Sequence, residues 1–340
     1  MKDRTSALAK ALYLKSAGNI EIGTYELPDK LKDGQALIKI NAAALNRRDL
    51  WIKQGKYAKI RENSILGSDG CGVVVSVSDY EYSEFKDAEV IINPNQFWGD
   101  NEKSQSEEYT ILGMPSPGTF SEYLIVEEDR LILKPKHLSS TQAAALPLAG
   151  LTAYRATFTQ GCVEKGTKVL ITGVGGGVSQ FVLQFCLAVG AEVYVTSSSD
   201  KNIKSAIKAG AKGGVNYKEH NWARQLKDQF GAFEVAIDSA GGDGLNSLIS
   251  LANYGGTIVS YGATAGAPNK LNIQSIFWKQ IRLLGSTMGS DRDFANMVEF
   301  VDKYKIVPTV DSVRPFSKII SAFDDMENGK VKGKLVIEMD

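Results

Sequence analysis

The chain has 340 residues, of which 43% are hydrophobic, and its 39 basic side chains equal its 39 acidic ones. This length favours two domains over a single core. Zero net charge without a basic stripe argues against nucleic acid or an anionic membrane as a partner. The three cysteines, Cys71, Cys162 and Cys186, are odd in number and far apart, which is typical of free thiols in a reducing compartment.

Residues 1–14, MKDRTSALAKALYL, contain no apolar run of signal-peptide or membrane-spanning length. Together with the cysteine pattern, this predicts a cytoplasmic protein that does not insert into a membrane.

The first part of the chain consists of short strand-like runs separated by Gly-Asn, Pro-Asp and Asp-Gly turns, and it predicts a small β-rich domain. A short helix is expected after Asn46. The polar residues 93–108 predict a solvated loop, and residues 139–158 predict a helix with Ser140 or Thr141 as its N-cap. The expected strands are residues 9–14, 20–27, 35–45 and 66–77, and strand character returns in residues 119–128 and 130–135.

Residues 168–196 have the pattern of a strand, a glycine-rich turn, a helix and a second strand. Glycines let a backbone approach a pyrophosphate closely, and the N-terminus of the helix that follows directs its free N–H groups at phosphate. The turn therefore predicts a dinucleotide site, with a purely structural turn as the alternative. Ser179 stands where a third glycine is expected, which predicts slight strain between helix and strand.

The end of the second strand bears on which dinucleotide binds. NAD-selective units carry a carboxylate at the strand tip, whereas NADP requires hydroxyls and a cation. This tip carries Ser197, Ser198 and Ser199, followed by Asp200 and Lys201. Because a dianionic phosphate prefers hydroxyl and ammonium donors, the sequence favours NADPH. Asp200 is either a displaced NAD-type acid or an N-cap.

Strands and helices then alternate, and six strands complete a doubly wound parallel sheet. A last strand, GKLVIEMD, follows two helices and is expected to return to the N-terminal domain. The fold class is α/β, with a β-rich catalytic domain over residues 1–150 and 289–340. A Rossmann dinucleotide-binding domain covers residues 151–288.

This order of parts resembles the medium-chain dehydrogenase/reductase superfamily, and its zinc-free quinone-oxidoreductase branch in particular. The N-terminal domain is accordingly expected to be GroES-like. The resemblance covers nearly the whole chain. The stretches that carry it are ALNRRDLWIKQGKY, ILGSDGCGVV, GTFSEYLIV, LPLAGLTAY, VLITGVGGGVSQ, VAIDSAGG, IVSYGAT, IFWKQIRLLGSTMGS and GKVKGKLVI.

Zinc-containing relatives hold the catalytic metal at places that here carry Asn46, Ser68 and Leu148, and residues 93–108 contain no cysteine for a structural zinc. Asn and Ser are poor zinc ligands and Leu is none, so no metal is expected. Without a Lewis acid, charge on oxygen must be met by hydrogen bonds, which is easier when hydride reaches a conjugated carbon.

The resemblance therefore implies an NADPH-dependent oxidoreductase that transfers hydride to a quinone or an α,β-unsaturated carbonyl. The alternatives are a sensing or structural NADPH-binding protein and an alcohol or aldehyde oxidoreductase. Arg47 and Arg48 would polarise an oxygen if they lie in the site, although surface arginines are commoner.

The resemblance also implies site residues. Asn46 and Tyr57 would orient substrate or cofactor, with a helix cap and a packed aromatic as the alternatives. The residues implied at the cofactor are Trp51, Thr152, Gly176, Gly177, Val178, Ser197, Ser198, Ser199, Lys201, Tyr217, Ala240, Tyr261 and Met288. Relatives often carry the lysine where Asn202 stands, one place beyond Lys201.

The last strand of the dinucleotide sheet, in IRLLGSTM, is apolar along its length, and an exposed edge of this kind invites pairing with a second chain. The sequence and the resemblance both predict a homodimer. In the alternative, residues 290–302 cover this edge.

Overall fold

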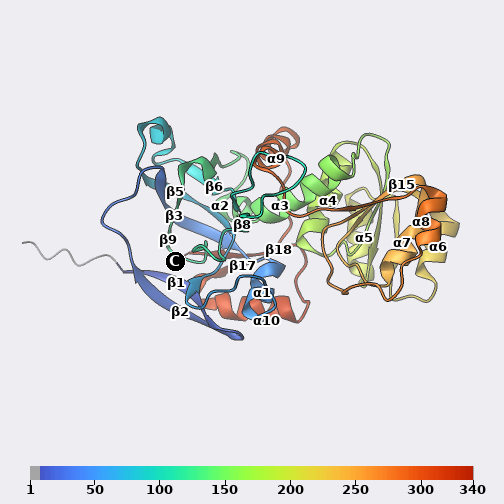
Figure 1. The fold of residues 1–340 in the computed structure, drawn as a ribbon, viewed down its shortest axis with the longest axis horizontal. Helices are drawn as coiled ribbons and strands as arrows, with labels where there is room; N and C mark the ends of the chain where they lie inside the picture. Colours follow the sequence, from blue (N-terminus) through green and yellow to red (C-terminus); the bar gives the residue numbers. More distant parts are fainter. Residues whose placement is uncertain (1–7, 340) are drawn as a thin grey trace, which may run out of the picture. The chain divides into compact units, whose positions relative to one another are not determined.

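The computed structural model describes residues 8–339, with Tyr80 described by its backbone alone. Its contacts divide the chain into two compact units (Figure 1). Unit 1 comprises Met1–Leu148 and Ser290–Asp340, and unit 2 comprises Ala149–Gly289. The prediction that no signal peptide is present rests partly on residues 1–7, which lie outside the described range. No helix of residues 8–339 is long and apolar enough to cross a membrane.

Unit 1 is built on a seven-stranded sheet whose central strand, β3 (Gln35–Ala44), pairs antiparallel with three others. Side chains of β3 alternate between buried and less buried positions, as expected of a strand with one face on a core. The sheet also contains β5 (Asp69–Val77), β6 (Glu89–Ile92), β9 (Tyr123–Glu127), β10 (Leu131–Leu133), β17 (Val310–Pro315) and β18 (Lys334–Glu338).

A three-stranded sheet of β1 (Leu8–Ser16), β2 (Asn19–Glu26) and β4 (Ser64–Ile65) completes most of the β structure of unit 1. The hydrophobic core contains Leu12, Ile38, Phe120 and Ile337. The helices are α1 (Arg47–Lys53), α2 (Ser140–Ala144), α9 (Asp291–Tyr304) and α10 (Ile319–Glu327), with short 3-10 turns η1 (Tyr80–Phe85), η2 (Glu128–Arg130) and η4 (Phe316–Lys318).

The chain returns to the first sheet as predicted: β18 pairs antiparallel with β3, and Val336 lies opposite Ala44. On its other side β18 pairs in parallel with β17, which the sequence did not predict. None of the residues of β17 is fully buried, and Pro315 ends it. A strand of this kind at the end of a sheet lacks the continuous apolar run by which a buried strand is recognised.

The prediction of a solvated loop over residues 93–108 is wrong for its first part. Asn93, Asn95 and Trp98 are buried, and the Trp98 ring packs edge-on against Tyr109 with 5.2 Å between ring centroids. Asn95 begins a short strand, β7 (Asn95–Gln96), which pairs with β8 (Thr110–Ile111). The residues from Gly99 onward are mostly exposed.

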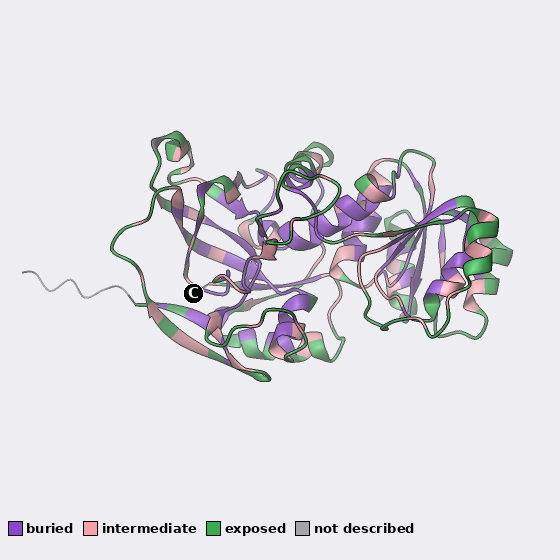
Figure 2. Cartoon of the chain, in the orientation of Figure 1, coloured by how far each residue is buried: buried purple, intermediate pink, exposed green. Residues whose placement is uncertain are grey.

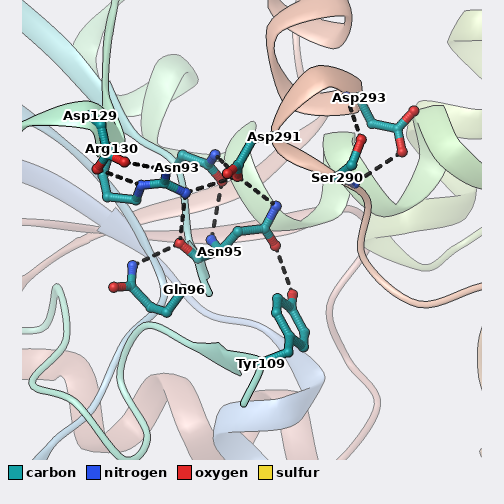
Figure 3. A network of polar contacts seen from close by, with 9 residues as sticks. All are labelled: Asn93, Asn95, Gln96, Tyr109, Asp129, Arg130, Ser290, Asp291 and Asp293. Carbon is teal, nitrogen blue, oxygen red and sulfur yellow. Dashed lines mark hydrogen bonds and ion pairs between the residues drawn. The ribbon is translucent and has the colours of Figure 1, made fainter. Parts of the chain in front are cut away.

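Figure 3 shows the polar network that holds this segment against the start of α9. The Asp291 carboxylate accepts hydrogen bonds from Asn93 Nδ2 and Arg130 Nη1, both at 2.8 Å. The Asn95 side chain accepts from the Tyr109 hydroxyl at 2.7 Å. The network therefore ties the returning segment of the chain to the first part of unit 1.

Unit 2 contains a six-stranded parallel sheet with the order β13-β12-β11-β14-β15-β16. Numbered along the chain from β11, this is the order 3-2-1-4-5-6 of a doubly wound dinucleotide fold, which confirms the predicted fold class. The strands are β11 (Lys168–Ile171), β12 (Glu192–Ser197), β13 (Gly213–Asn216), β14 (Phe233–Asp238), β15 (Ala252–Ser260) and β16 (Arg282–Gly285).

Each consecutive pair of strands is joined by a crossover that includes a helix, as parallel pairing requires. The helices are α4 (Gly177–Ala188), α5 (Asp200–Ala209), α6 (Trp222–Phe230), α7 (Gly244–Leu251) and α8 (Ile273–Lys279). Figure 2 shows the central strands largely buried, whereas α8 is mostly exposed.

The helix expected over residues 139–158 is interrupted. α2 ends at Ala144, α3 (Pro147–Tyr154) begins at a proline, and a π-helical segment, η3 (Arg155–Gln160), follows. Proline suits the first turn of a helix, where its missing N–H has no partner to lose. The N-cap is Ser139, whose hydroxyl accepts from the Gln142 amide, so the expectation of Ser140 or Thr141 is wrong.

Candidate functional site

The glycine-rich turn of unit 2 connects β11 to α4 at the point where the strand order reverses between β11 and β14. Gly173 has φ +60, a left-handed conformation that favours glycine. Gly176 is the N-cap of α4, and Gly177 and Val178 form its first turn. These are the three residues predicted at the pyrophosphate, and they lie where open α/β sheets bind their ligands.

Ser179, where slight strain was predicted, forms hydrogen bonds within the turn. Its side chain is buried, and its hydroxyl lies 2.7 Å from the Gly173 carbonyl oxygen and 3.0 Å from that of Gly176. The serine therefore replaces the third glycine with a hydrogen bond that stabilises the turn.

The predicted adenosine-side residues gather at the carboxyl ends of β12 and β13. Ser197 is buried and its hydroxyl accepts from the Ser199 amide, while Ser198 and Lys201 are exposed. The Tyr217 amide donates to the Ser197 carbonyl, and the Tyr217 side chain is exposed. The side chains of Ser197, Ser198, Ser199 and Lys201 thus lie close together in sequence at the carboxyl end of β12.

Asp200 is not the N-cap of α5, because Ser199 holds that position. Its carboxylate accepts a hydrogen bond from Asn216 Nδ2 at 2.9 Å. The side chain of the neighbouring Asn202 lies beside the glycine-rich turn. If Gly175 carried a Cβ, that atom would lie 2.5 Å from Asn202 Nδ2. The residue where relatives carry a lysine is therefore the one beside the turn.

The other residues predicted at the cofactor also lie at strand ends or helix ends of unit 2. Ala240 follows β14, and its amide donates to the Asp238 carboxylate; Tyr261 follows β15. The Thr152 hydroxyl lies 3.7 Å from Met288 Sδ. Met288 has φ +45, an uncommon backbone conformation for a residue with a side chain.

In unit 1 the predicted catalytic residue Asn46 belongs to a buried cluster centred on Asp69. Asp69 Oδ1 accepts from the Leu148 amide at 2.7 Å. Asp69 Oδ2 accepts from Asn46 Nδ2 at 2.9 Å and from Lys334 Nζ at 2.8 Å. Lys334 also donates to the Asn46 side-chain oxygen and the Leu45 carbonyl. Both polar ends of the Asn46 amide are thus held by the protein.

A second cluster forms around Arg48, two residues further along α1. Arg48 Nη1 donates to Ser68 Oγ at 2.5 Å and to the Leu112 carbonyl at 2.8 Å. Arg48 Nε lies 3.4 Å from the hydroxyl of Tyr57, and the guanidinium carbon is 4.9 Å from the centroid of that ring. The structure thus brings Tyr57 to Arg48 and not to Asn46. Arg47 is exposed.

Asp49 and Trp51 are two further residues of α1 that bear on the site. The Asp49 side chain is buried, and its Oδ2 accepts from the Asn46 amide at 2.8 Å. Burial raises the pKa of Asp49 to about 6, and the positive charge of Arg48 opposes that rise. Trp51 is half-buried, so its predicted cofactor contact stays a prediction.

The residues at the three zinc-ligand places do not fit a zinc ion. Lys334 Nζ contacts Asn46, Arg48 Nη1 contacts Ser68, and Leu148 offers only its backbone. Two cations therefore already bond the only side-chain oxygens there, and a dication next to them would be repelled. Among the described residues, no group of three or more His, Cys, Asp or Glu side chains is placed to hold a metal.

Sequence reasoning missed Asp69 and Lys334 as parts of this site. Each is the first residue of a largely apolar strand and has a glycine beside it, and a charged residue in such a setting is rarely buried unless it is paired. Both Asp69 and Lys334 show this sequence signal, but they lie 265 residues apart, so the sequence does not show that they pair with each other.

Two family models match the chain. The alcohol dehydrogenase GroES-like domain matches residues 32–136, and the zinc-binding dehydrogenase model matches residues 177–303. A zinc-type alcohol dehydrogenase-like protein of Leptosphaeria maculans is 36% identical over 326 residues, which is 90% of each chain. A 2-methylene-furan-3-one reductase of Solanum lycopersicum is 30% identical over 95% of this chain and 75% of its own.

Among solved structures, an NAD-dependent alcohol dehydrogenase is 30% identical, with a TM-score of 0.91 over 97% of this chain and 100% of its own. The solved structure shares the fold seen here, and the names of the three proteins include both alcohol dehydrogenases and a reductase.

Proposed function

Because the chain belongs to the medium-chain dehydrogenase/reductase superfamily, we propose that it is a zinc-independent, NADPH-dependent oxidoreductase that transfers hydride to an α,β-unsaturated carbonyl or a quinone. The chain is an oxidoreductase that uses a nicotinamide cofactor, as its relatives are. The substrate class and the preference for NADPH are the proposal.

The observation that carries the proposal is the pair of buried cations at the zinc-ligand places. Lys334 and Arg48 bond Asn46 and Ser68 there, so neither of these two side chains is free to bind a metal. An alcohol oxidoreductase of the zinc type needs a Lewis acid on the substrate oxygen. Reduction of a conjugated carbon instead spreads charge onto an oxygen that hydrogen-bond donors stabilise.

The preference for NADPH is supported by the tip of β12. Ser198, Ser199 and Lys201 supply hydroxyls and an ammonium group to an extra phosphate, and Asn202 adds an amide beside the glycine-rich turn. The Asp200 carboxylate is engaged by Asn216, which weakens the alternative that it binds the ribose of NAD. Gly176, Gly177 and Val178 would hold the pyrophosphate, with Thr152, Tyr217, Ala240, Tyr261 and Met288 as the remaining proposed contacts.

We further propose a cytoplasmic homodimer. Three cysteines that form no disulfide fit a reducing compartment. The exposed edge strand β16 and the exposed apolar side chains of α8 offer a surface for a second copy.

The proposed function is tested by turnover. The purified chain is incubated with NADPH and, in separate assays, with a quinone, an enone or a saturated aldehyde. A fourth assay contains NADP⁺ and a primary alcohol. The nicotinamide absorbance is followed in each. We expect oxidation of NADPH with the quinone or the enone. Activity confined to the aldehyde and alcohol would favour an alcohol oxidoreductase. Stoichiometric NADPH binding without turnover would favour a sensing or structural role.

A further inference from the structure

Unit 1 buries two cations in its polar site, and of these only Lys334 lies within ion-pair distance of a carboxylate among the described residues. The Lys334 ammonium lies 2.8 Å from the Asp69 carboxylate. Arg48 is just as buried, with 6% of its surface exposed. Within the described part of the chain, however, Arg48 forms no ion pair, and its Nη1 contacts are the neutral oxygens of Ser68 and Leu112.

One face of the Arg48 guanidinium group also lacks a hydrogen-bond acceptor. Nη2 is buried and has no partner among the described residues. An unpaired buried donor is costly, and more so when it carries charge. Asp49 is the nearest acid in sequence. Its Oδ2 accepts from the Asn46 amide and its Oδ1 is buried without a hydrogen-bond partner, so neither oxygen accepts from Nη2.

The remaining contacts fix the guanidinium in one orientation. Nη1 is held by two oxygens, Nε lies 3.4 Å from the Tyr57 hydroxyl, and the Tyr57 ring packs against the guanidinium plane. A planar donor fixed on two of its nitrogens presents the third at a defined position. This is the arrangement expected of a preorganised group that stabilises negative charge on a ligand.

We infer that Arg48, through Nη2, binds the oxygen of the substrate on which negative charge develops, and that it takes the role that a metal ion has in zinc-containing relatives. The inference rests on the proposed function and narrows it to substrates with a hydrogen-bond-accepting oxygen conjugated to the carbon that receives hydride. Tyr57 is a positioning residue for Arg48.

The reaction balances without a metal. Bound NADPH would supply hydride to form a C–H bond at the β-carbon of the enone, and the π electrons would move onto oxygen, where Arg48 Nη2 would donate a hydrogen bond to the enolate. A proton from solvent then adds to the α-carbon. The products are the saturated carbonyl compound and NADP⁺.

The test compares Arg48→Met, Arg48→Lys and, as a control, Arg61→Met, which removes an exposed arginine of the same unit. Methyl vinyl ketone and menadione serve as substrates. We expect Arg48→Met to lower kcat/KM about a hundredfold or more, mainly through kcat, as loss of a preorganised donor does. Arg48→Lys should lower it at least about tenfold, because one ammonium group cannot keep both Nη1 contacts and also reach the ligand. The NADPH Kd and the Arg61→Met variant should stay at wild-type values.

A second measurement does not depend on turnover. The chromogenic phenol p-nitrophenol is titrated onto the NADP⁺ complex, where contact with a guanidinium should lower the pKa of the bound phenol and shift its spectrum toward the phenolate. We expect the shift in the wild type and in Arg61→Met, and its loss in Arg48→Met. If Arg48→Met does not fold, the Arg48→Lys variant serves as the test, and we expect it to show a smaller shift of the p-nitrophenol spectrum than the wild type.

The outcomes separate the two proposals. If the Arg48 variants keep wild-type kcat/KM and the wild-type phenolate shift, Arg48 has only a structural role and the inference is overturned. If no variant, including the wild type, oxidises NADPH but the shift is present and depends on Arg48, the proposed function fails and the oxygen site stands.

Discussion

Lys334, near the C-terminus, and Asp69, in the first sheet, form an ion pair of 2.8 Å with 3% and 0% of their side-chain surfaces exposed. A buried pair gains little over apolar residues of the same shape, but removal of one partner leaves an uncompensated charge. The pair therefore makes the fold of unit 1 depend on two strands far apart in sequence.

Lys334→Met should destabilise unit 1 by about 3–5 kcal/mol, because the buried Asp69 carboxylate would lose its ion-pair partner. Urea unfolding of the unit 1 transition measures this. The control is Lys330→Met, which removes an exposed lysine 3.7 Å from Asp325 and should cost at most about 1 kcal/mol. Equal losses in the two variants would contradict the importance of the buried pair.

NADPH should bind more tightly than NADH. Lys201→Ala should cost about 1–3 kcal/mol of NADPH affinity as a lost charge-assisted bond, with NADH binding little changed. Asn202→Ala offers a comparison, because Asn202 lies beside the glycine-rich turn. Lys208→Ala, in the last turn of α5, is the control. Fluorescence titration with both cofactors is sufficient, and an equal loss for NADPH and NADH in Lys201→Ala would show that the lysine does not contact the extra phosphate.

The purified chain should contain no stoichiometric zinc. The positions at which zinc-containing relatives carry their zinc ligands hold Asn46, Ser68 and Leu148. The side-chain oxygens of Asn46 and Ser68 accept hydrogen bonds from Lys334 and Arg48. Elemental analysis after incubation with zinc and dialysis measures the content. One zinc per chain would refute both this prediction and the argument about substrates drawn from it.

The chain should form a homodimer through β16. The strand is the edge of its sheet, with Leu283 39% exposed, and Phe277 and Trp278 on α8 are more exposed still. The alternative is that residues 290–302, most of which form α9 of unit 1, cover this edge. Sedimentation at micromolar concentration should give the mass of two chains, and a mass of one chain would refute the dimer.

The edge can be blocked without breaking the sheet. The Ser286 amide donates inward to Ser260, so by the two-residue period of a strand the Leu283 amide points to the open edge and the Leu284 amide points toward β15. Leu283→Pro should therefore give folded monomers. Leu284→Pro, the matched control, should destabilise unit 2. A dimeric Leu283→Pro variant would place the interface elsewhere.

Only one thiol should react in the folded chain. Burial raises the pKa of Cys71 and of Cys186 to about 12, so both stay protonated at pH 8, whereas Cys162 is exposed. Titration with a disulfide reagent should give one thiol per native chain and three in denaturant. More than one fast-reacting thiol in the native chain would contradict the buried positions.

The parts of the fold with strong local patterns could be predicted from sequence. The six strands of unit 2 were recognised because they alternate with helical segments and most of them are short apolar runs, and the doubly wound sheet is confirmed. β17 was missed because an edge strand without a fully buried residue has no such pattern. The burial of Asn93 and Asn95 was missed because it depends on partners such as Arg130 and Asp291, which no local window contains.

The candidate site shows the same limit. The glycines alone predict the first turn of α4. The sequence of α1, in contrast, does not predict which side chains contact Asn46. Asn46 was predicted to orient a ligand, but the structure gives both ends of its amide to Asp69 and Lys334. The unpaired nitrogen belongs to Arg48, which in sequence looks like one of two adjacent surface arginines.

The discontinuity of unit 1 has a consequence for synthesis on the ribosome. Unit 2 is one continuous segment, Ala149–Gly289, whereas β3 gains its neighbour β18 only when residues 334–338 have been made. Domains generally fold as units, in the order in which they are synthesised. Until Lys334 arrives, Asp69 lacks its ion-pair partner, and residues 42–44 of β3 lack the strand that pairs with them on the β18 side. A ribosome stalled before Lys334 would therefore carry a folded unit 2 and an unfinished unit 1, although the synthesis of unit 1 began first.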